Sequence, residues 1–510
     1  MNPRIYSAAL QGLDAQLVEV EATLSSGLRS FLIVGLADTA VKEARERVHS
    51  AIKQAGLSFP RGRIAVNLAP ADVKKQGTIY DLPIALSILH ALGEIPTESL
   101  AGALFVGELA LDGNVRAVNG ALLFALGAKT AKLKRLFVPT ENVQEALLVS
   151  GLEIFGVPSL PALIKHLRSE EALVPATKNP SVHHETKNAA EFDMMHVRGQ
   201  EAAKRALEIA AAGNHNLLLS GPPGSGKTLL ARTMPTILPS MTQNEALEVT
   251  KIYTASGMLA PQQGLIEERP FRSPHHTTSG VALVGGGANP RPGEVTLAHR
   301  GVLFLDEFPE FHRASLENLR QPLEDGVVTI SRAAGTMRYP ARFLLVAAMN
   351  PCPCGFASDP LHPCICSNID LQRYRRKISG PLLDRIDLLI EVPKVDTEKL
   401  TSEEMGESSE SIQTRVQEAR DRQLARLKGT KLTCNSELST RAAKEQSALS
   451  AEALSFVRNA TETLGLSARA FTRVLKVART IADLAGAARV DVVHLAEALQ
   501  YRPKISLESH

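Results

Sequence analysis

The sequence predicts a multidomain α/β protein. Three observations support this prediction: a chain of 510 residues is long enough for about three domains, a strand-like run near its middle leads through a glycine-rich loop into a helix, and its C-terminal part shows only helical periodicity. Hydrophobic residues make up 44% and charged residues 22%, as in globular proteins with sizeable cores. We expect four segments: an α+β domain at 1–170, a linker at 171–191, a core with a parallel sheet at 192–395 that carries a cysteine-rich insertion at 351–367, and a helical lid at 396–510.

The composition limits which cellular compartment and which kinds of binding partner we expect for this protein. The net charge is only +3, so composition alone does not indicate a nucleic-acid partner, and any basic surface must be local. No uninterrupted apolar run is long enough to span a bilayer. Residues Met1–Tyr6 do not begin the apolar region of a signal peptide. We therefore expect a cytoplasmic protein without a membrane partner.

Residues 1–170 alternate between strand-like and helix-like patterns. Ser30–Gly35 is apolar enough for a buried strand, and Asp38 can cap the helix that follows. Asp81–Leu89 has the pattern of a buried helix, with its proline tolerated in the first turn. The alternation predicts a folded α+β domain at this end of the chain.

Three stretches of this first segment carry a resemblance to a known family: Lys75–Gly77, Gly107–Gly113 and Val138–Asn142. The segment from the first of them to the last resembles the proteolytic domain of Lon-type proteases. Lon proteases use a Ser–Lys dyad, but Thr78 follows the glycine here, and the place of the lysine is taken by Ala121–Leu123. The resemblance therefore implies a Lon-like fold without the dyad, and a protease that uses Thr78 with another base is the less favoured alternative.

The middle of the chain contains the phosphate-binding pattern G-x-x-x-x-G-K-T. It follows the apolar run Leu217–Leu219 and leads into a helical pattern, so the backbone N–H groups of the loop can surround a polyphosphate at a helix N-terminus. We expect Lys227 to reach the β- and γ-phosphates of ATP and the Thr228 hydroxyl to hold Mg²⁺. The predicted loop consists of Gly221, Pro222, Pro223, Gly224, Ser225, Gly226, Lys227 and Thr228.

Two later strands end in polar residues that suit the same site. The apolar run Gly301–Leu305 ends in Asp306 and Glu307, the Walker B pattern, which predicts that Asp306 orients Mg²⁺ and that Glu307 is the general base for the attacking water. The run Phe343–Met349 ends in Asn350, whose amide can hold that water or contact the γ-phosphate. These patterns predict an enzyme that hydrolyses ATP with Mg²⁺.

Between the loop and the Walker B strand, Phe271–Ser279 and Gly285–His299 form the most distinctive stretch of the chain. With the motifs above, it resembles the ComM/YifB family, relatives of the magnesium-chelatase ATPase subunit and of the MCM helicases. This resemblance implies a ring-forming AAA+ ATPase, with a hexamer expected. It also implies helicase and branch-migration work on single-stranded or branched DNA in natural transformation and homologous recombination. A chelatase-like ATPase that remodels a protein partner is the alternative.

The resemblance implies that two arginines contact a nucleotide. Arg385 would be an arginine finger that reaches the nucleotide of a neighbouring subunit, and an ion pair with Asp384 or Asp387 is the alternative. Arg469, at the start of a lid helix, would contact the γ-phosphate, with Arg473 as the alternative.

The resemblance also implies two hairpins that face the pore of the ring. One is an insertion near Gly285–Glu294, and the other pairs Val327–Arg332 with Met337–Tyr339. For any one basic residue on these hairpins, an exposed arginine that binds no partner is an equally open interpretation. The candidate contacts to DNA phosphates are Arg291, Arg332 and Arg338.

Candidate metal ligands gather just after Asn350. Four of the five cysteines form a C-x-C…C-x-C set: Cys352, Cys354, Cys364 and Cys366. In a reducing compartment, such a cluster is more typical of a metal-binding site than of disulfide bonds. The spacing leaves structural Zn²⁺ and free buried cysteines equally open, with an iron–sulfur cluster less favoured. We do not expect His275 and His276 to bind metal, because adjacent side chains diverge on a strand.

Overall fold

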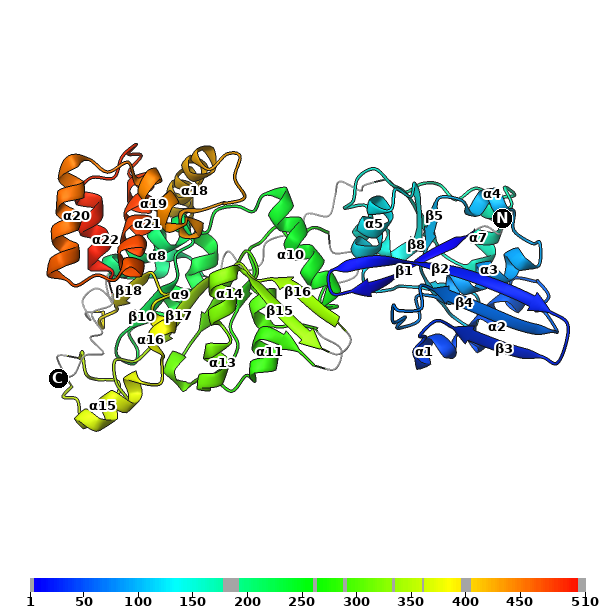
Figure 1. Cartoon of the computed structure of the whole chain (residues 1–510), viewed down its shortest axis with the longest axis horizontal. Coiled ribbons are helices and arrows are strands. Elements are labelled where there is room, and N and C mark those ends of the chain that lie inside the picture. Colours follow the sequence, from blue (N-terminus) through cyan, green and yellow to red (C-terminus); the bar gives the residue numbers. More distant parts are fainter. Residues whose placement is uncertain are drawn as a thin grey trace. The chain divides into compact units, whose positions relative to one another are not determined.

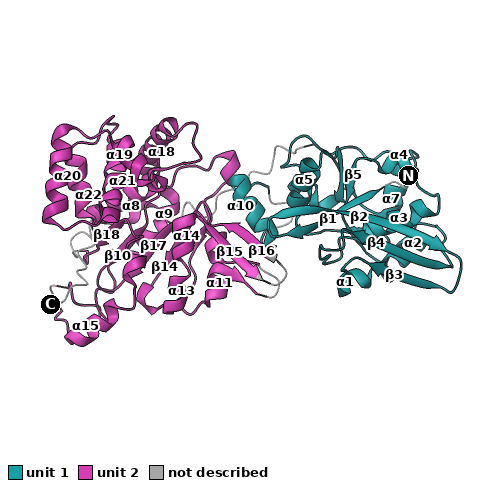
Figure 2. Ribbon diagram, in the orientation of Figure 1, with its two compact units in different colours: residues 1–184, 246–266 teal, residues 185–245, 267–510 magenta. Residues whose placement is uncertain are grey.

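The computed structural model describes residues 4–177, 192–259, 264–287, 291–332, 335–359, 362–395 and 405–502. Two compact units make up the chain (Figure 2): unit 1 comprises residues 1–184 and 246–266, and unit 2 comprises residues 185–245 and 267–510. Most of the predicted linker at 171–191 lies outside the described residues, and the four-segment division remains a prediction. Among the described helices, none has both the length and the apolarity to cross a membrane.

Unit 1 is built on a mixed seven-stranded sheet with the order β3-β4-β2-β1-β5-β8-β9 (Figure 1). Its apolar residues form two clusters on opposite faces. Helices α2, α3 and α7 cover one face, and α5 and α6 cover the other. The sheet strands are β1 (Ile5–Gln11), β2 (Asp14–Ser25), β3 (Ser30–Val34), β4 (Arg63–Ala69), β5 (Ala103–Phe105), β8 (Arg135–Pro139) and β9 (Glu153–Val157), and a small ribbon pairs β6 (Glu108–Leu109) with β7 (Val115–Arg116). The helices are α1 (Thr39–Lys42), α2 (Ala44–Gln54), α3 (Asp81–Ala91), α4 (Thr97–Leu100), α5 (Ala121–Thr130), α6 (Val143–Ala146) and α7 (Leu160–Leu167).

Two details of unit 1 differ from the prediction. Ser30–Gly35 was expected to be a buried strand, but β3 is the edge strand of the sheet, and Leu32 and Val34 are 46% and 43% exposed. Asp38 does cap a helix, accepting a hydrogen bond from the Val41 N–H (2.9 Å), but that helix ends at Lys42 and α2 begins separately at Ala44. Composition alone shows that a strand is apolar, whereas its place in the sheet decides how much of it is covered.

Unit 2 contains the predicted parallel sheet, which is confirmed. Its five strands follow the order β11-β14-β17-β10-β18, and every pair is parallel. Strands β14 and β17 are buried along their whole length, as expected where helices cover both faces. The strands are β10 (Leu217–Ser220), β11 (Phe271–Arg272), β14 (Val302–Leu305), β17 (Leu344–Met349) and β18 (Leu388–Glu391). The helices along this part are α8 (Glu201–Gly213), α9 (Lys227–Ile237), α11 (Gly280–Val284), α12 (Glu294–Leu297), α13 (Arg313–Glu317), α14 (Arg320–Asp325), α15 (Asn368–Arg375) and α16 (Gly380–Leu383). Helix α10 (Gln243–Ala255) begins in unit 2, and most of its residues belong to the 246–266 segment of unit 1.

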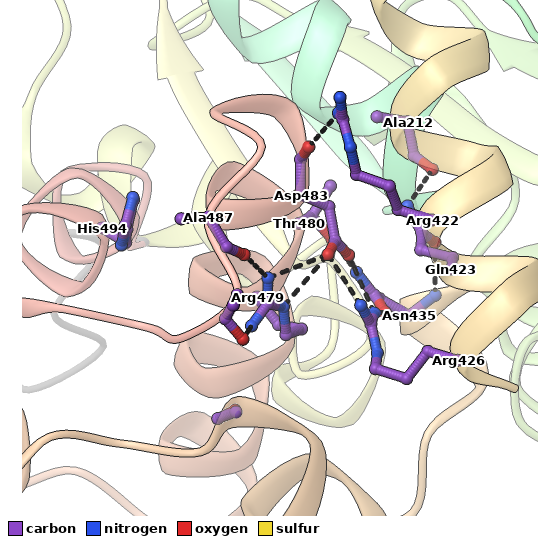
Figure 3. A network of polar contacts seen from close by, with 12 residues as sticks. Ala212, Arg422, Gln423, Arg426, Asn435, Arg479, Thr480, Asp483, Ala487 and His494 are labelled. Atoms are coloured by element: carbon purple, nitrogen blue, oxygen red, sulfur yellow. Dashed lines mark hydrogen bonds and ion pairs between the residues drawn. The ribbon is translucent and has the colours of Figure 1, made fainter.

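The C-terminal part is helical, as predicted, and its helices and loops are joined by hydrogen bonds to one buried carboxylate. Asp483 on α21 is 1% exposed and accepts hydrogen bonds from Arg426 (2.7 and 2.8 Å), Arg479 (2.9 Å) and Asn435 (2.8 Å), as Figure 3 shows. Gln423 donates to the Ala212 carbonyl of α8 (3.0 Å), which joins the lid to the core of unit 2. The lid helices are α18 (Ser409–Arg426), α19 (Thr440–Ser447), α20 (Ala451–Thr463), α21 (Ala468–Leu484) and α22 (Val492–Gln500).

Candidate active site

The predicted phosphate loop connects the end of β10 to the start of α9. Gly226 has φ +82° at the N-cap of α9, a conformation that favours glycine, and the loop thereby turns into the helix. The Lys227 ammonium is buried and donates to the carbonyl oxygens of Gly221 (2.8 Å) and Pro222 (2.9 Å) and to Asn350 Oδ1 (3.3 Å). Burial lowers the pKa of Lys227, and the nearby Asp306 carboxylate opposes that shift.

The structure brings the end of the Walker B strand to the same loop. Strands β14, β17 and β10 are neighbours in the sheet, so the residues after their carboxyl ends meet at one edge. Thr228 Oγ1 donates to Asp306 Oδ2 at 2.8 Å. Adjacent oxygens in an octahedral Mg²⁺ shell lie about 2.9 Å apart, so this hydroxyl and this carboxylate fit one magnesium shell.

Glu307 has a partner that the sequence did not reveal. Its backbone is left-handed (φ 50°, ψ 44°), its side chain is 60% exposed, and its Oε2 lies 2.9 Å from Nδ1 of His276. The rings of His275 and His276 lie 4.1 Å apart, so the expectation that they diverge on a strand was wrong. The reason is that β11 ends at Arg272, and the two histidines follow it in non-strand backbone. The sequence signals for such a contact were their position between two predicted motifs and their place in the distinctive stretch Phe271–Ser279.

Arg385 is held by neither of the two acids that the sequence suggested. It donates to the Pro381 carbonyl (2.5 Å) and to the Glu324 carboxylate. Asp384 instead accepts from Arg473 (3.4 Å), and Asp387 lies 3.3 Å from His215. Among the hydrogen bonds of the described residues, the buried Nε of Arg385 has no partner.

Arg385 and Arg469 line one cavity of about 640 Å³ at the other edge of the sheet. Its walls include Asn216, Phe343 and Asp387, which immediately precede β10, β17 and β18. The phosphate loop follows the carboxyl end of β10. Strands of four to six residues separate the two edges by about 13–20 Å. The structure therefore does not bring these arginines to Lys227 of the same chain.

Arg473, the alternative to Arg469, is engaged in holding the fold. It donates to the Ile386 carbonyl (2.7 Å) and the Leu383 carbonyl (3.3 Å), and so ties α21 to the end of α16. Arg469 is exposed in the first turn of α21.

The four clustered cysteines converge, and the set is compatible with a bound Zn²⁺. Their Sγ atoms all lie within 4.8 Å of one another, and all four are free thiols. Backbone N–H groups of Phe356 and Ile365 point at the Cys354 sulfur and lower the pKa of this thiol to about 6. Thiolates are the form that binds metal.

Two antiparallel hairpins form in the segments where the sequence predicted them. β15 (Val327–Arg332) pairs with β16 (Gly335–Pro340), and β12 (Gly285–Gly286) pairs with β13 (Arg291–Pro292). Among the candidate DNA contacts, the side chains of Arg291 and Arg338 are exposed, Arg332 ends β15, and the turn residues 288–290 and 333–334 lie outside the described residues.

Thr78, the remaining candidate for a protease nucleophile in unit 1, is hydrogen-bonded to a carboxylate. The Thr78 hydroxyl donates to the Glu108 carboxylate, and a carboxylate partner of this kind is not the lysine of a Ser–Lys dyad. Ala121, at the other position of the missing dyad, begins α5 and is buried.

Comparison with known proteins gives a consistent result. Three family models match: Magnesium chelatase, subunit ChlI, over residues 193–400, Subunit ChlI of Mg-chelatase over residues 20–142, and Magnesium chelatase, subunit ChlI C-terminal, over residues 406–502. The chain is 44% identical to Competence protein ComM of Haemophilus influenzae over 99% of this chain and 98% of that protein. It is 42% identical to the YifB protein of Escherichia coli over 98% of this chain and 96% of that protein. Lon protease 2 of Bacillus subtilis is 30% identical over 26% of each chain.

Proposed function

The chain belongs to the ComM/YifB family of magnesium-chelatase-like proteins, and from this membership we propose that it is a ring-forming ATPase that drives helicase and branch-migration work on DNA. The family suggests an AAA+ ATPase that uses ATP and Mg²⁺. The name of the Haemophilus relative, a competence protein, supports a role in natural transformation and homologous recombination.

The observation that carries the ATPase proposal is that five polar residues follow three neighbouring strands and that the structure pairs Lys227 with Asn350 and Thr228 with Asp306. Lys227 and the first N–H groups of α9 would bind the phosphates, and Thr228 and Asp306 would hold Mg²⁺, which neutralises charge on the transferred phosphoryl group. Glu307 would take the proton of the attacking water, and Asn350 would orient that water. These assignments extend the observed contacts to the reaction.

The arginines at the opposite edge support a shared nucleotide site. Because Arg385 and Arg469 line a cavity at the end of the sheet opposite the phosphate loop, with strands of about 13–20 Å between the two ends, we assign them to the nucleotide of a neighbouring subunit. A head-to-tail contact of this kind closes into a ring when the rotation between subunits allows it. The family resemblance favours six subunits.

The hairpins provide the proposed contact with DNA. Arg291, Arg332 and Arg338 lie on or beside two short hairpins, and the exposed side chains of Arg291 and Arg338 are free to approach phosphates. Such contacts do not depend on sequence, which suits a motor that moves single-stranded or branched DNA.

Free cysteines favour a cytoplasmic location, because the cytosol keeps thiols reduced. The same four clustered thiols are assigned to one Zn²⁺ ion. ATP, Mg²⁺ and Zn²⁺ are thus the proposed cofactors and substrates of the chain.

The decisive experiment is ATP-dependent branch migration on a synthetic three-strand junction. Wild-type protein should convert the junction in the presence of ATP and Mg²⁺, whereas Glu307→Gln should bind the junction without converting it. An ATPase that DNA does not stimulate, with no junction conversion, would instead favour the chelatase-like remodelling of a protein partner.

A further inference from the structure

The four-cysteine set lies directly beside the candidate ATP site. Cys352 and Cys354 follow the end of β17 by only a few residues, and Cys364 and Cys366 come just before α15. The sulfurs of Cys352 and Cys354 lie 3.3 Å apart, those of Cys352 and Cys364 3.7 Å, and those of Cys354 and Cys364 3.6 Å. The set thus joins the strand that ends in Asn350 to the helix that follows.

These separations suit a single metal ion. A tetrahedral ion with bonds of about 2.3 Å to sulfur has its four sulfurs about 3.8 Å apart. All four Sγ atoms lie within 4.8 Å of one another, which leaves room for one ion at their centre. Soft thiolate ligands in a tetrahedral set select zinc or iron over Mg²⁺.

The turn between the first two cysteines and α15 touches the phosphate loop. Gly355 has φ +88°, and its N–H donates to the Cys352 carbonyl (3.0 Å). A Cβ atom added to Gly355 would lie only 2.7 Å from Cγ and Cδ of Pro223 and 4.0 Å from Cγ of Asn350. The backbone at Gly355 is therefore packed closely on the loop that would hold the phosphates.

A second contact links α15 to the same site. The Tyr374 hydroxyl on α15 donates to the Asn350 carbonyl at 3.2 Å. Asn350 in turn accepts from the Lys227 ammonium. The cysteine set therefore connects the Gly355 turn, which contacts the phosphate loop, to α15, which contacts Asn350.

We propose that one zinc ion bound by Cys352, Cys354, Cys364 and Cys366 clamps the Gly355 turn against Pro223, so that nucleotide binding depends on the metal. The inference rests on the proposed ATPase for the identity of the nucleotide. Zinc would fix the turn because metal ligation orders the loop that carries the four ligands. Loss of the ion would release the Gly355 turn and Asn350 together.

The first test measures metal content and nucleotide affinity on the full-length protein. Wild-type protein from defined medium should carry about one zinc per chain by elemental analysis. Cys364→Ser changes an exposed ligand and should lose that zinc and bind a fluorescent non-hydrolysable ATP analogue about tenfold more weakly. Cys434→Ser changes the fifth cysteine, which lies outside the set, and should keep both the zinc and the affinity.

The second test separates the clamp from the metal. Gly355→Ala keeps all four ligands but pushes a methyl group into Pro223, so zinc should stay bound while affinity for the analogue falls about tenfold or more. Gly429→Ala is the matched control, because Gly429 also has φ +88° but has no atom within 4 Å of its added Cβ. It carries the same backbone strain and should leave analogue binding unchanged.

The outcomes are separable. Wild-type protein with no zinc above the level of Cys364→Ser would overturn the metal site, and iron in place of zinc would overturn the identity of the ion. Zinc-free Cys364→Ser with wild-type affinity would overturn the clamp, as would a Gly355→Ala protein that binds like Gly429→Ala. None of these measurements involves DNA, so a protein that fails to migrate junctions would refute the proposed function and leave this inference standing.

Discussion

Replacing Arg385 by alanine tests whether one nucleotide is shared between two copies of the chain. Arg385 lines a cavity at the amino edge of the parallel sheet, and strands of four to six residues separate that edge by about 13–20 Å from the edge that carries the phosphate loop. A guanidinium cannot bridge that distance. If the arginine completes a neighbour's site, Arg385→Ala should lower kcat for ATP about 10³-fold and leave ATP affinity nearly unchanged.

The assay is ATP hydrolysis by rings mixed from two inactive variants. Lys227→Ala lacks the phosphate-loop lysine but keeps Arg385, and Arg385→Ala keeps the loop. In an equal mixture, about a quarter of the interfaces combine an intact loop with an intact arginine, so activity should return to about a quarter of the wild-type rate. Mixing Lys227→Ala with wild-type protein is the control and should leave about half of the sites complete.

Two results would refute this reasoning. No recovery in the mixture, although the variants assemble together, would mean that both residues serve the same nucleotide from one chain. Arg385→Ala protein that hydrolyses ATP at the wild-type rate would remove Arg385 from the reaction and leave it as the partner of Glu324.

Two further predictions concern the C-terminal helices and Glu307, the proposed general base. Asp483→Ala leaves the buried Arg479 and the half-buried Arg426 without their carboxylate and should lower the free energy of unfolding of unit 2 by about 3–5 kcal/mol in urea titrations. Glu445→Ala, which removes an exposed helical ion pair, should cost about 0.5 kcal/mol or less, and equal losses for both variants would contradict the argument. His276→Ala should lower kcat for ATP about tenfold with KM unchanged, because His276 contacts Glu307 and not the phosphate loop. His275→Ala is the control in the same steady-state assay, and a His276→Ala effect confined to KM would exclude the positioning role.

The sequence predicted the parts of the site that depend on local pattern. A glycine loop between a strand and a helix is a local structure, so Gly221–Thr228 could be placed as a strand–loop–helix unit before any fold was known. The helical C-terminal part follows from apolar periodicity, and the parallel sheet is what the phosphate-loop and family resemblance implied; the structure confirms both. Whether each named residue performs its assigned step stays a prediction.

The sequence could not predict contacts between segments far apart in the chain. β17 lies between β14 and β10, although it follows both in sequence, and this order brings Asn350 to Lys227. The contact of His276 with Glu307 and the approach of Gly355 to Pro223 likewise join segments with no shared local pattern.

The amino-acid sequence by itself determined which segments are strands, which loop can surround a phosphate and which four thiols can gather, because backbone propensity and residue spacing act over short range. Only the tertiary structure decided that Arg385 and Arg469 lie away from the phosphate loop of their own chain. It also decided that the Gly355 turn packs on that loop. The physical reason is that packing of the whole core sets the order of strands in the sheet, and that order decides which ends of which strands become neighbours.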